Sequence, residues 1–463
     1  QRPIGMVHMT ANDTPTRRIA TFLAGLESNA IPEPVRRAAL QQTLEIITGL
    51  FAGLDVAEMA ALLDHFSHAE PAEALIPATG FRRERSAAAG AAAALSHAAE
   101  SDPIHAGTAI CAAAVSVPVA LVLAQNSAVS GARFIAAVAG GCEAAIRVGT
   151  AIRAASLLPR GWWPTAVCGG IGAAATTSIA LGMNARQTAD AIGLAAVQAG
   201  GLGAGGPAAP AARNLLCAQT VRHGVEAALL AQAGISGPPE PLAGERGYLS
   251  TFCETPDAGA LTDALGSRWA VADISLKAWP CALQAQTALD ALATIARDND
   301  IDPDEIRAIG IALPGPMARI VDRPGPPASQ FAACASVQFL AAALLIDGDV
   351  TGARLGQGRD DRSVLALADR VRVHTDAALD ARLPEAWPAR VTISTATGDH
   401  TAQSDIPPGH PDRPLSFEDS ADRFRRAAAP HLPPDRITRI VETVENLADL
   451  PDCGVLSDWL RPG

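Results

Sequence analysis

The sequence is poor in aromatic and charged residues. Phe, Trp and Tyr make up 4% of the 463 residues and charged residues 18%, whereas hydrophobic residues reach 49%. The apolar content must therefore come from Ala, Leu, Val and Ile, which favours close-packed helices over aromatic-rich sandwiches. With 36 basic against 48 acidic residues the net charge is −12. That balance argues against nucleic acid or an anionic membrane surface as a partner.

Lysine is almost absent. Lys277 is the only lysine, and every other basic residue is arginine. Arginine stays charged in proteins, whereas a buried lysine can shift its pKa and act as an acid or base. Chance survival under a bias towards arginine is the alternative. Trp279 and Pro280 beside Lys277 indicate a dry setting, where desolvation would lower the lysine pKa and a nearby carboxylate would raise it.

Cysteine pairs with zinc-site or redox spacing are also missing. The eight cysteines are scattered, with no C-x-x-C and no histidine at zinc spacing. Residues 1–10 lack the apolar stretch of a signal peptide. We therefore expect a cytoplasmic protein with buried, reduced thiols, without a metal site or organic cofactor.

Long apolar runs are present but are not typical of membrane spans. Residues 103–132, 161–185 and 191–212 carry no charge, and each run is long enough to cross a bilayer. They are rich in Ala, Gly, Ser and Thr, and prolines interrupt them. A helix buried in a large all-α domain is apolar on every side for the same reason. We therefore predict core helices and no membrane partner.

The periodicity of apolar residues predicts a mostly α protein with two kinds of domain. Residues 1–13 look like a flexible tail. After about residue 270, alternating patterns predict strands at 306–313, 370–374 and a hairpin over 391–404, with a helix over 331–345 between them. We expect a large helical domain from 14–274 and 406–463, and an inserted α+β domain over 275–405. Helices are predicted at 14–26, 31–53, 87–99, 107–125, 130–155, 166–182, 186–199, 212–234, 416–427 and 434–447.

One loop concentrates groups that can exchange protons. His97, Glu100, Asp102 and His105 fall within nine residues, between two apolar helices. Such a cluster can hold acid and base groups whose pKa values are pushed apart. A solvated loop with a proline turn is the alternative.

Several segments, in this order, resemble the MmgE/PrpD family, whose members are dehydratases, decarboxylases and epimerases of small carboxylic acids. The likeness covers nearly the whole chain. It implies a large helical domain built from both chain ends, a smaller α+β domain, and a homodimer. The segments are Ile31-Pro-Glu-Pro, the loop 97–105, 161–165, the run from Arg222-His-Gly, Lys277-Ala-Trp-Pro-Cys, 339–351 and 446–453.

The chain departs from the family pattern at the site that the resemblance implies. The family loop reads His-x-Leu-Asp-Phe-Asp-Asp-Thr, and here Glu100 replaces the first Asp, while Asp102 keeps the second. Ile104, with Pro103 before it, replaces the Asp-Thr pair. Two family histidines become Cys111 and Trp163, a family lysine becomes Arg213, and Lys277 is kept. The changes remove groups that titrate near neutrality and add apolar surface.

We expect a cofactor-independent lyase or isomerase that removes a proton next to a carboxylate or carbonyl of a small molecule. Lys277 and Arg213 would stabilise the developing negative charge. Two alternatives stay open: a repurposed enzyme acting on a larger, less polar metabolite, and a non-catalytic binding relative. The candidate catalytic residues are Lys277, Asp102, Glu100, His105 and Cys111. The candidate substrate-binding residues are Arg213, Trp163, Trp162, Ile104 and His97.

Overall fold

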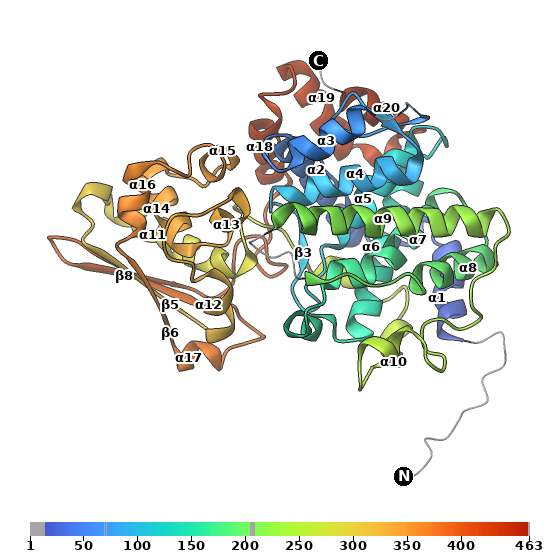
Figure 1. Ribbon diagram of the computed structural model, residues 1–463, viewed down its shortest axis with the longest axis horizontal. Coiled ribbons are helices and arrows are strands. Elements are labelled where there is room, and N and C mark those ends of the chain that lie inside the picture. The colour runs from blue at the N-terminus through green and yellow to red at the C-terminus, as the bar shows by residue number, and fades with distance from the viewer. Residues whose placement is uncertain (1–13, 69, 71, 204–208, 462–463) are drawn as a thin grey trace, which may run out of the picture.

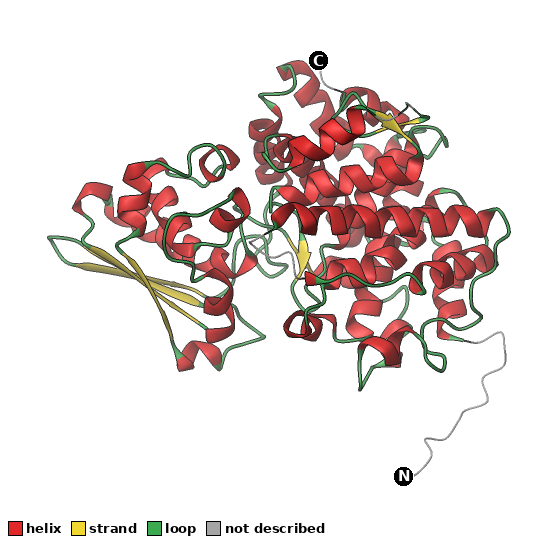
Figure 2. Ribbon diagram, viewed as in Figure 1, coloured by secondary structure: helices red, strands yellow, loops and turns green. Residues whose placement is uncertain are grey.

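The computed structural model describes residues 14–68, 70, 72–203 and 209–461. The predicted flexible tail, 1–13, lies outside the described residues. The chain forms a large helical body and a smaller α+β body, and the first and last described helices both belong to the large one (Figure 1). The predicted mostly α fold is confirmed (Figure 2).

The large body is a stack of helices whose N-terminal and C-terminal parts pack together. Helix α18 lies against α2, and α19 also contacts α2. The helices are α1 (Pro15–Ala24), α2 (Glu33–Leu54), α3 (Met59–Ser67), α4 (Arg85–Ala98), α5 (Ala112–Ala124), α6 (Gly131–Ala151), α7 (Pro164–Ala180), α8 (Ala185–Ala196), α9 (Pro210–Gln232), α10 (Tyr248–Phe252), α18 (Phe417–Ala428), α19 (Pro434–Glu445) and α20 (Gly454–Trp459).

Small residues let these helices approach closely. A Cβ atom on Gly53 of α2 would lie 2.1 Å from the carbonyl oxygen of Leu95 in α4, and one on Gly224 of α9 would lie 2.3 Å from that of Gly170 in α7. Two of the three predicted apolar runs contain core helices: α5 is buried throughout, and nearly every residue of α7 is buried. The third, 191–212, includes the exposed residues Val197 and Leu202 after α8. Helix α6, which is long and apolar enough to cross a membrane, is 94% buried over its most apolar window. Ala-rich, aromatic-poor composition therefore serves tight helix packing.

The small body is a four-stranded sheet with helices against it. The strand order is β6 (Val371–Thr375), β5 (Ala308–Leu313), β7 (Ala389–Ser394) and β8 (Asp399–Ser404), with β5 and β6 parallel and the other pairs antiparallel. Helix α11 (Gln286–Asn299) packs on β7 and β8, and α14 (Val337–Asp347) lies beside β6 and α16 (Arg362–Ala368). The remaining short helices are α12 (Gly315–Val321), α13 (Gln330–Cys334), α15 (Gly352–Leu355) and α17 (Ala377–Asp380).

Two local predictions differ from the structure. The single helix predicted over 331–345 is two helices, α13 and α14, because the Ser336 hydroxyl accepts the backbone N–H of Phe339 and begins a new helix. The large body is not wholly helical. It carries the ribbon of β1 (Ala74–Leu75) and β2 (Arg82–Arg83), and a second ribbon of β3 (Ile104–His105) and β4 (Ile274–Ser275).

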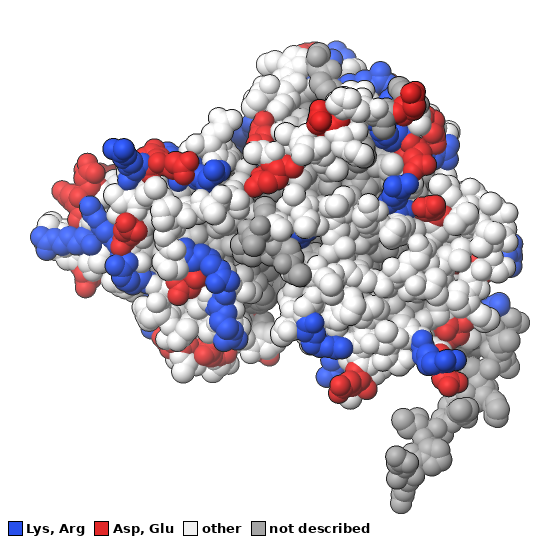
Figure 3. Space-filling view, in the orientation of Figure 1, with Lys and Arg blue, Asp and Glu red and all other residues white. Residues whose placement is uncertain are grey.

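Each body has its own hydrophobic core. One core gathers buried residues between Ile19 and Ile274 together with others between Ala421 and Leu460, and the second gathers residues between Cys281 and Ile393. The domain limits at 274/275 and 405/406 stay predictions. On the face in Figure 3, charged side chains crowd the small body, whereas the centre of the large body is mostly uncharged. The large body also contains buried charged side chains, which this face does not show.

Candidate active site

A short ribbon brings Lys277 to the acidic loop. Ile104 of β3 pairs with Ser275 of β4, which places Lys277 beside the residues that precede β3. Its Nζ donates to the backbone oxygen of Glu100 at 2.8 Å and lies 3.6 Å from both Glu100 Oε2 and Asp102 Oδ1. Only 4% of the Lys277 side chain is exposed. The sole lysine is therefore an internal ammonium between two carboxylates.

Glu100 has a left-handed backbone, with φ of 57°. A non-glycine residue adopts this conformation at a cost of about 1–3 kcal/mol, and such residues concentrate at functional sites. The turn directs the Glu100 carbonyl to Lys277, while its carboxylate forms an ion pair with Arg213 in the first turn of α9. Arg213 Nη2 also donates to the His97 carbonyl oxygen at 3.2 Å. Glu100 thus joins both buried cations.

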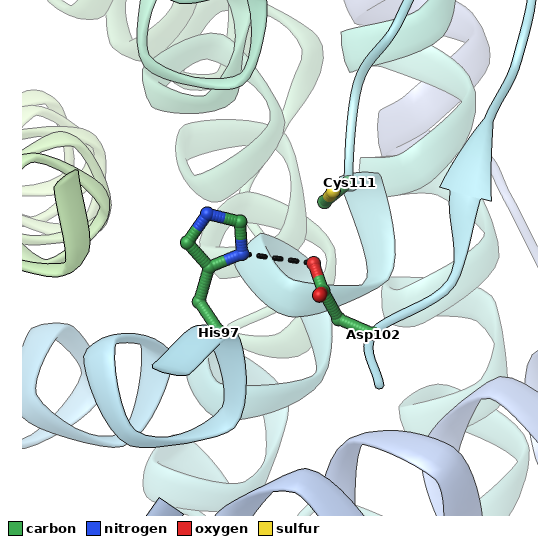
Figure 4. A group of neighbouring side chains, drawn as sticks. All are labelled: His97, Asp102 and Cys111. Atoms are coloured by element: carbon green, nitrogen blue, oxygen red, sulfur yellow. Dashed lines mark hydrogen bonds and ion pairs between the residues drawn. The ribbon is translucent and has the colours of Figure 1, made fainter. Parts of the chain in front are cut away.

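His97, Asp102 and Cys111 form the second half of the cluster (Figure 4). His97, in the last turn of α4, has its Nδ1 2.8 Å from Asp102 Oδ2, and both side chains are 1% exposed. Cys111, at the start of α5, has its backbone N–H bonded to Thr165 Oγ1 at 3.1 Å. The potential ligand atoms of His97, Asp102 and Cys111 all lie within 4.8 Å of one another.

This trio has the donor types of a metal site, but its surroundings disfavour a cation. The Lys277 ammonium is 3.6 Å from Asp102. Burial, reinforced by the charge of Asp102, raises the pKa of the Cys111 thiol well above its usual range, so the sulfur keeps its proton. A cation there would face the Lys277 ammonium, and Asp102 already forms a hydrogen bond with His97. The trio therefore suits hydrogen bonding better than metal binding.

The four charged groups of the cluster hold one another in their charged forms. Burial alone would raise the carboxyl pKa values, but Arg213 and Lys277 lower that of Glu100, and His97 and Lys277 lower that of Asp102. Likewise, burial would lower the pKa values of the two cations, but Asp102 and Glu100 raise both. At Lys277, the two carboxylates therefore raise the pKa by more than desolvation lowers it.

Two aromatic rings enclose the Arg213 guanidinium. Its Cζ lies 4.4 Å from the ring centroid of Phe331 and 5.4 Å from that of Trp163. Trp163 also meets His97 edge-on, with ring centroids 6.2 Å apart. Phe331 belongs to α13 of the small body and did not emerge from the sequence, because only the tertiary fold brings it to α9. The site therefore uses residues from both bodies.

Three buried polar atoms around Trp163 have no hydrogen-bond partner among the described residues. They are Arg213 Nε, Trp163 Nε1 and His97 Nε2. Buried polar atoms in native proteins are almost always bonded to protein or to water, so a group of exceptions requires an explanation. A polar ligand or ordered water beside Trp163 would satisfy them.

Gln286 is a second residue that the sequence did not single out. It is fully buried at the start of α11, and its Oε1 accepts the backbone N–H groups of Ala278 at 3.1 Å and Trp279 at 3.3 Å. Its Nε2 donates to the Trp279 carbonyl oxygen at 2.8 Å. Gln286 therefore fixes the segment that follows Lys277.

Three predicted site residues make their described contacts elsewhere. His105 hydrogen-bonds to Thr108 Oγ1 at 2.8 Å, and burial lowers its pKa. Trp162 packs edge-on against Phe252, with centroids 5.5 Å apart. Ile104 packs against the large core. Trp162 and Trp163 are consecutive residues at a helix start, and their side chains point in different directions. Only Trp163 therefore contacts His97 and Arg213.

All eight cysteines are free thiols, and seven are buried. Cys217, Cys281 and Cys334 lie close enough to the cluster for its charges to influence them. Burial is the main cause that raises the pKa of Cys217 and Cys281 to about 12, and burial also raises that of Cys334 well above its usual range. With Cys111, four protonated thiols therefore surround the charges.

The fold and this site define a known class. Residues 17–260 match the MmgE/PrpD N-terminal domain, and residues 279–449 match the MmgE/PrpD C-terminal domain. The chain therefore belongs to the MmgE/PrpD family, as the sequence motifs predict.

Individual relatives are decarboxylases by name. The chain is 30% identical to the cis-aconitate decarboxylase of Homo sapiens over 66% of its own length and 64% of the relative's. The Mus musculus protein of that name is 29% identical over 66% and 63% of the two lengths. The cis-aconitate decarboxylase-like protein oryM of Aspergillus oryzae is 27% identical over 78% and 79%. The match thus spans less than two thirds of the two mammalian proteins.

Proposed function

We propose that this protein is a lyase of the dehydratase or decarboxylase type that acts on a small carboxylic acid. The observation that carries the proposal is the buried Lys277 ammonium, held between Glu100 and Asp102 next to unbonded polar groups. The named activity of the cis-aconitate decarboxylases supports the same reaction class. Cofactor independence, a homodimer and a cytoplasmic location remain predictions from the sequence.

Both reactions pass through negative charge next to a carboxylate or carbonyl. In a dehydration, a base takes the proton from that carbon, and the electron pair enters an enolate. The pair then forms the C=C bond as the β-hydroxyl group gains a proton and leaves as water. In a decarboxylation, the bond to the departing CO₂ supplies the electron pair, and a proton returns to carbon. Lys277 is preorganised to stabilise the enolate oxygen in either case.

His97 is better placed to carry the proton than the acids predicted from the sequence. Glu100 and Asp102 have lowered pKa values and so accept protons poorly. In the neutral imidazole, Nδ1–H donates to Asp102 Oδ2, which leaves the lone pair on Nε2, the atom without a partner. A carboxylate-oriented imidazole with a bare nitrogen is suited to general-base work. We assign this role to His97, with Asp102 as its positioning residue.

The substrate carboxylate fits beside Arg213. The Nε of this residue has no partner among the described residues, and neither has Nε1 of Trp163, whose ring lies 5.4 Å from the guanidinium carbon. Arg213, rather than Lys277, then becomes the anchor, and Lys277 is left for the reacting atoms.

The test is the substitution Lys277→Met. The full-length wild type and variant are incubated in D₂O with a panel of unsaturated and β-hydroxy carboxylic acids that includes cis-aconitate. Product formation and deuterium uptake at carbon are followed by NMR. We expect the variant to lose roughly 10³-fold or more in turnover, in line with removal of a preorganised charge stabiliser.

Arg297→Met is the matched control, because it removes an exposed cation that is 70% accessible and pairs only with neighbouring Asp298 in the described structure. Its turnover should equal that of the wild type. Near-wild-type turnover by a folded Lys277→Met variant would refute the proposed function.

A further inference from the structure

The buried cluster contains as much negative as positive charge. Its two cations, Lys277 and Arg213, face two carboxylates, Glu100 and Asp102, and no side chain of the four is more than 10% exposed. The lowered carboxyl pKa values and raised cation pKa values keep all four ionised near neutrality. The site thus offers an entering anion hydrogen-bond donors but no net positive charge.

The donors that remain free suffice for about one carboxylate. Arg213 Nε and Trp163 Nε1 are buried donors without a partner among the described residues, and His97 Nε2 is a third buried atom without one. They surround one indole, because Arg213 stacks 5.4 Å from the Trp163 ring centroid and His97 lies 6.2 Å from it. A carboxylate has two oxygens and about four acceptor sites. One group can use these donors, and a second would find none in this set.

The other residues near the cluster offer no partner for a second substrate carboxylate. Phe331 covers Arg213 at 4.4 Å, and the thiols of Cys111, Cys281 and Cys334 are protonated because burial raises their pKa values. An unpaired carboxylate in such surroundings carries a large desolvation penalty. Protonated sulfur and aromatic rings instead favour contact with a hydrocarbon body.

We infer that the substrate of this site carries a single carboxylate on an otherwise apolar body, and that Glu100 determines this preference by neutralising Arg213. The inference rests on the proposed function and narrows it. It sets this chain apart from its relatives named for cis-aconitate, which is a tricarboxylate. A substrate that lost its only carboxylate as CO₂ would lose the group that anchors it at Arg213, so the inference favours elimination of water over loss of CO₂.

Binding of unreactive acids tests the inference without any turnover. Butanoate, succinate and propane-1,2,3-tricarboxylate carry one, two and three carboxylates and have no hydroxyl group or double bond to react. Calorimetric titration of the full chain at fixed ionic strength should give an affinity for butanoate about tenfold above succinate and about 100-fold above the tricarboxylate. 4-Phenylbutanoate should bind more tightly than butanoate, because its ring adds apolar contact.

Glu100→Gln removes the internal counter-charge. We expect it to raise the affinity for succinate and the tricarboxylate about tenfold or more, and that for butanoate less. Glu84→Gln is the matched control, since Glu84 is 57% exposed and pairs with Arg222 at the surface. If Glu100→Gln does not fold, Glu100→Ala removes the same charge with a smaller side chain and should move the same affinities in the same direction.

Each outcome decides the question. Tightest binding of the tricarboxylate by the wild type, or no binding of any acid, overturns the inference. So do unchanged ratios between the three affinities in a folded Glu100 variant that lacks the carboxylate. If monocarboxylates bind but no acid on the panel is turned over, the proposed function fails while the inference survives. If a tricarboxylate is turned over in a Lys277-dependent way, the function survives and the inference fails.

Discussion

Two of the buried groups of charges in the large body differ in how completely their hydrogen bonds are satisfied. In the first group, Arg147 of α6 bonds to Glu143 at 2.6 Å, and its remaining N–H groups reach three backbone carbonyls of the segment 260–268 at 2.8–3.2 Å. Glu143 in turn accepts the Val271 N–H at 3.2 Å. This pair fastens a loop to a helix, and each of the three guanidinium nitrogens of Arg147 has at least one hydrogen-bond partner.

The second group is the cluster around Lys277, and it leaves donors unused. Arg213 stacks between two rings, and its Nε has no partner among the described residues. Both groups are buried and both contain an arginine–glutamate ion pair, so burial and ion pairing do not separate a structural site from a functional one. Completeness of hydrogen bonding distinguishes these two groups.

The largest expected effect comes from exchanging the two arginines for methionine. Arg147→Met breaks a buried pair and four hydrogen bonds, and should lower the free energy of unfolding by about 3–5 kcal/mol. Arg213→Met should lower the free energy of unfolding less, because Glu100 still pairs with Lys277. It should weaken butanoate binding about 100-fold. Urea unfolding and calorimetric titration of both variants measure these effects. Equal stability loss in both variants, with equal binding, would contradict the distinction drawn between the two groups.

Much of the fold was predictable because it depends on local periodicity. The helix predicted at 212–234 is Pro210–Gln232, and the strand predicted at 306–313 is Ala308–Leu313. Helix α11, Gln286–Asn299, has no counterpart among the predicted elements, although Leu289, Leu292 and Ile295 repeat at helical spacing. Turns such as the one at Ser336 depend on a single side-chain hydrogen bond, which periodicity does not record.

The candidate site was predictable only where composition or a motif marked it. Lys277 stood out because it is the sole lysine, and the loop around Asp102 because of its clustered carboxylates and imidazoles. Phe331 and Gln286 carry no such mark. Phe331 contacts a residue 118 positions earlier in the chain, and Gln286 acts through backbone groups, so both roles exist only in the folded molecule.

The two groups should also respond to pH in different ways. Burial raises the pKa of Glu143 above the ordinary value of 4.5, whereas His97 and Lys277, against the effect of burial, lower that of Asp102 below 3.8. Between the unfolded and folded pKa values of Glu143, the folded protein holds a proton that the unfolded chain has lost. Stability therefore falls as pH rises through that window. At pH 5.5 and above, Asp102 is ionised in both states and adds no slope.

Paired urea titrations at a series of pH values from about 5 to about 8 test this contrast. The stability difference between wild type and Glu143→Gln should shrink as the pH rises above the ordinary glutamate pKa of 4.5. The stability loss in Asp102→Asn should stay constant over the same range, and would decline only as the pH falls below 3.8. If the stability loss changed with pH in the same way in both variants, the proposed difference in pH response between the two groups would be wrong.

The smallest expected effect concerns the ring that covers Arg213. Phe331→Leu keeps an apolar side chain on α13 but removes the ring face 4.4 Å from the guanidinium. A cation–π contact of this kind is worth about 1 kcal/mol, which corresponds to about a fivefold loss in butanoate affinity. Phe417→Leu, at a half-buried phenylalanine on the large core, is the control and should leave the affinity unchanged. An equal effect of both changes would mean that Phe331 only fills space, and that Arg213, like Arg147, is held without help from the small body.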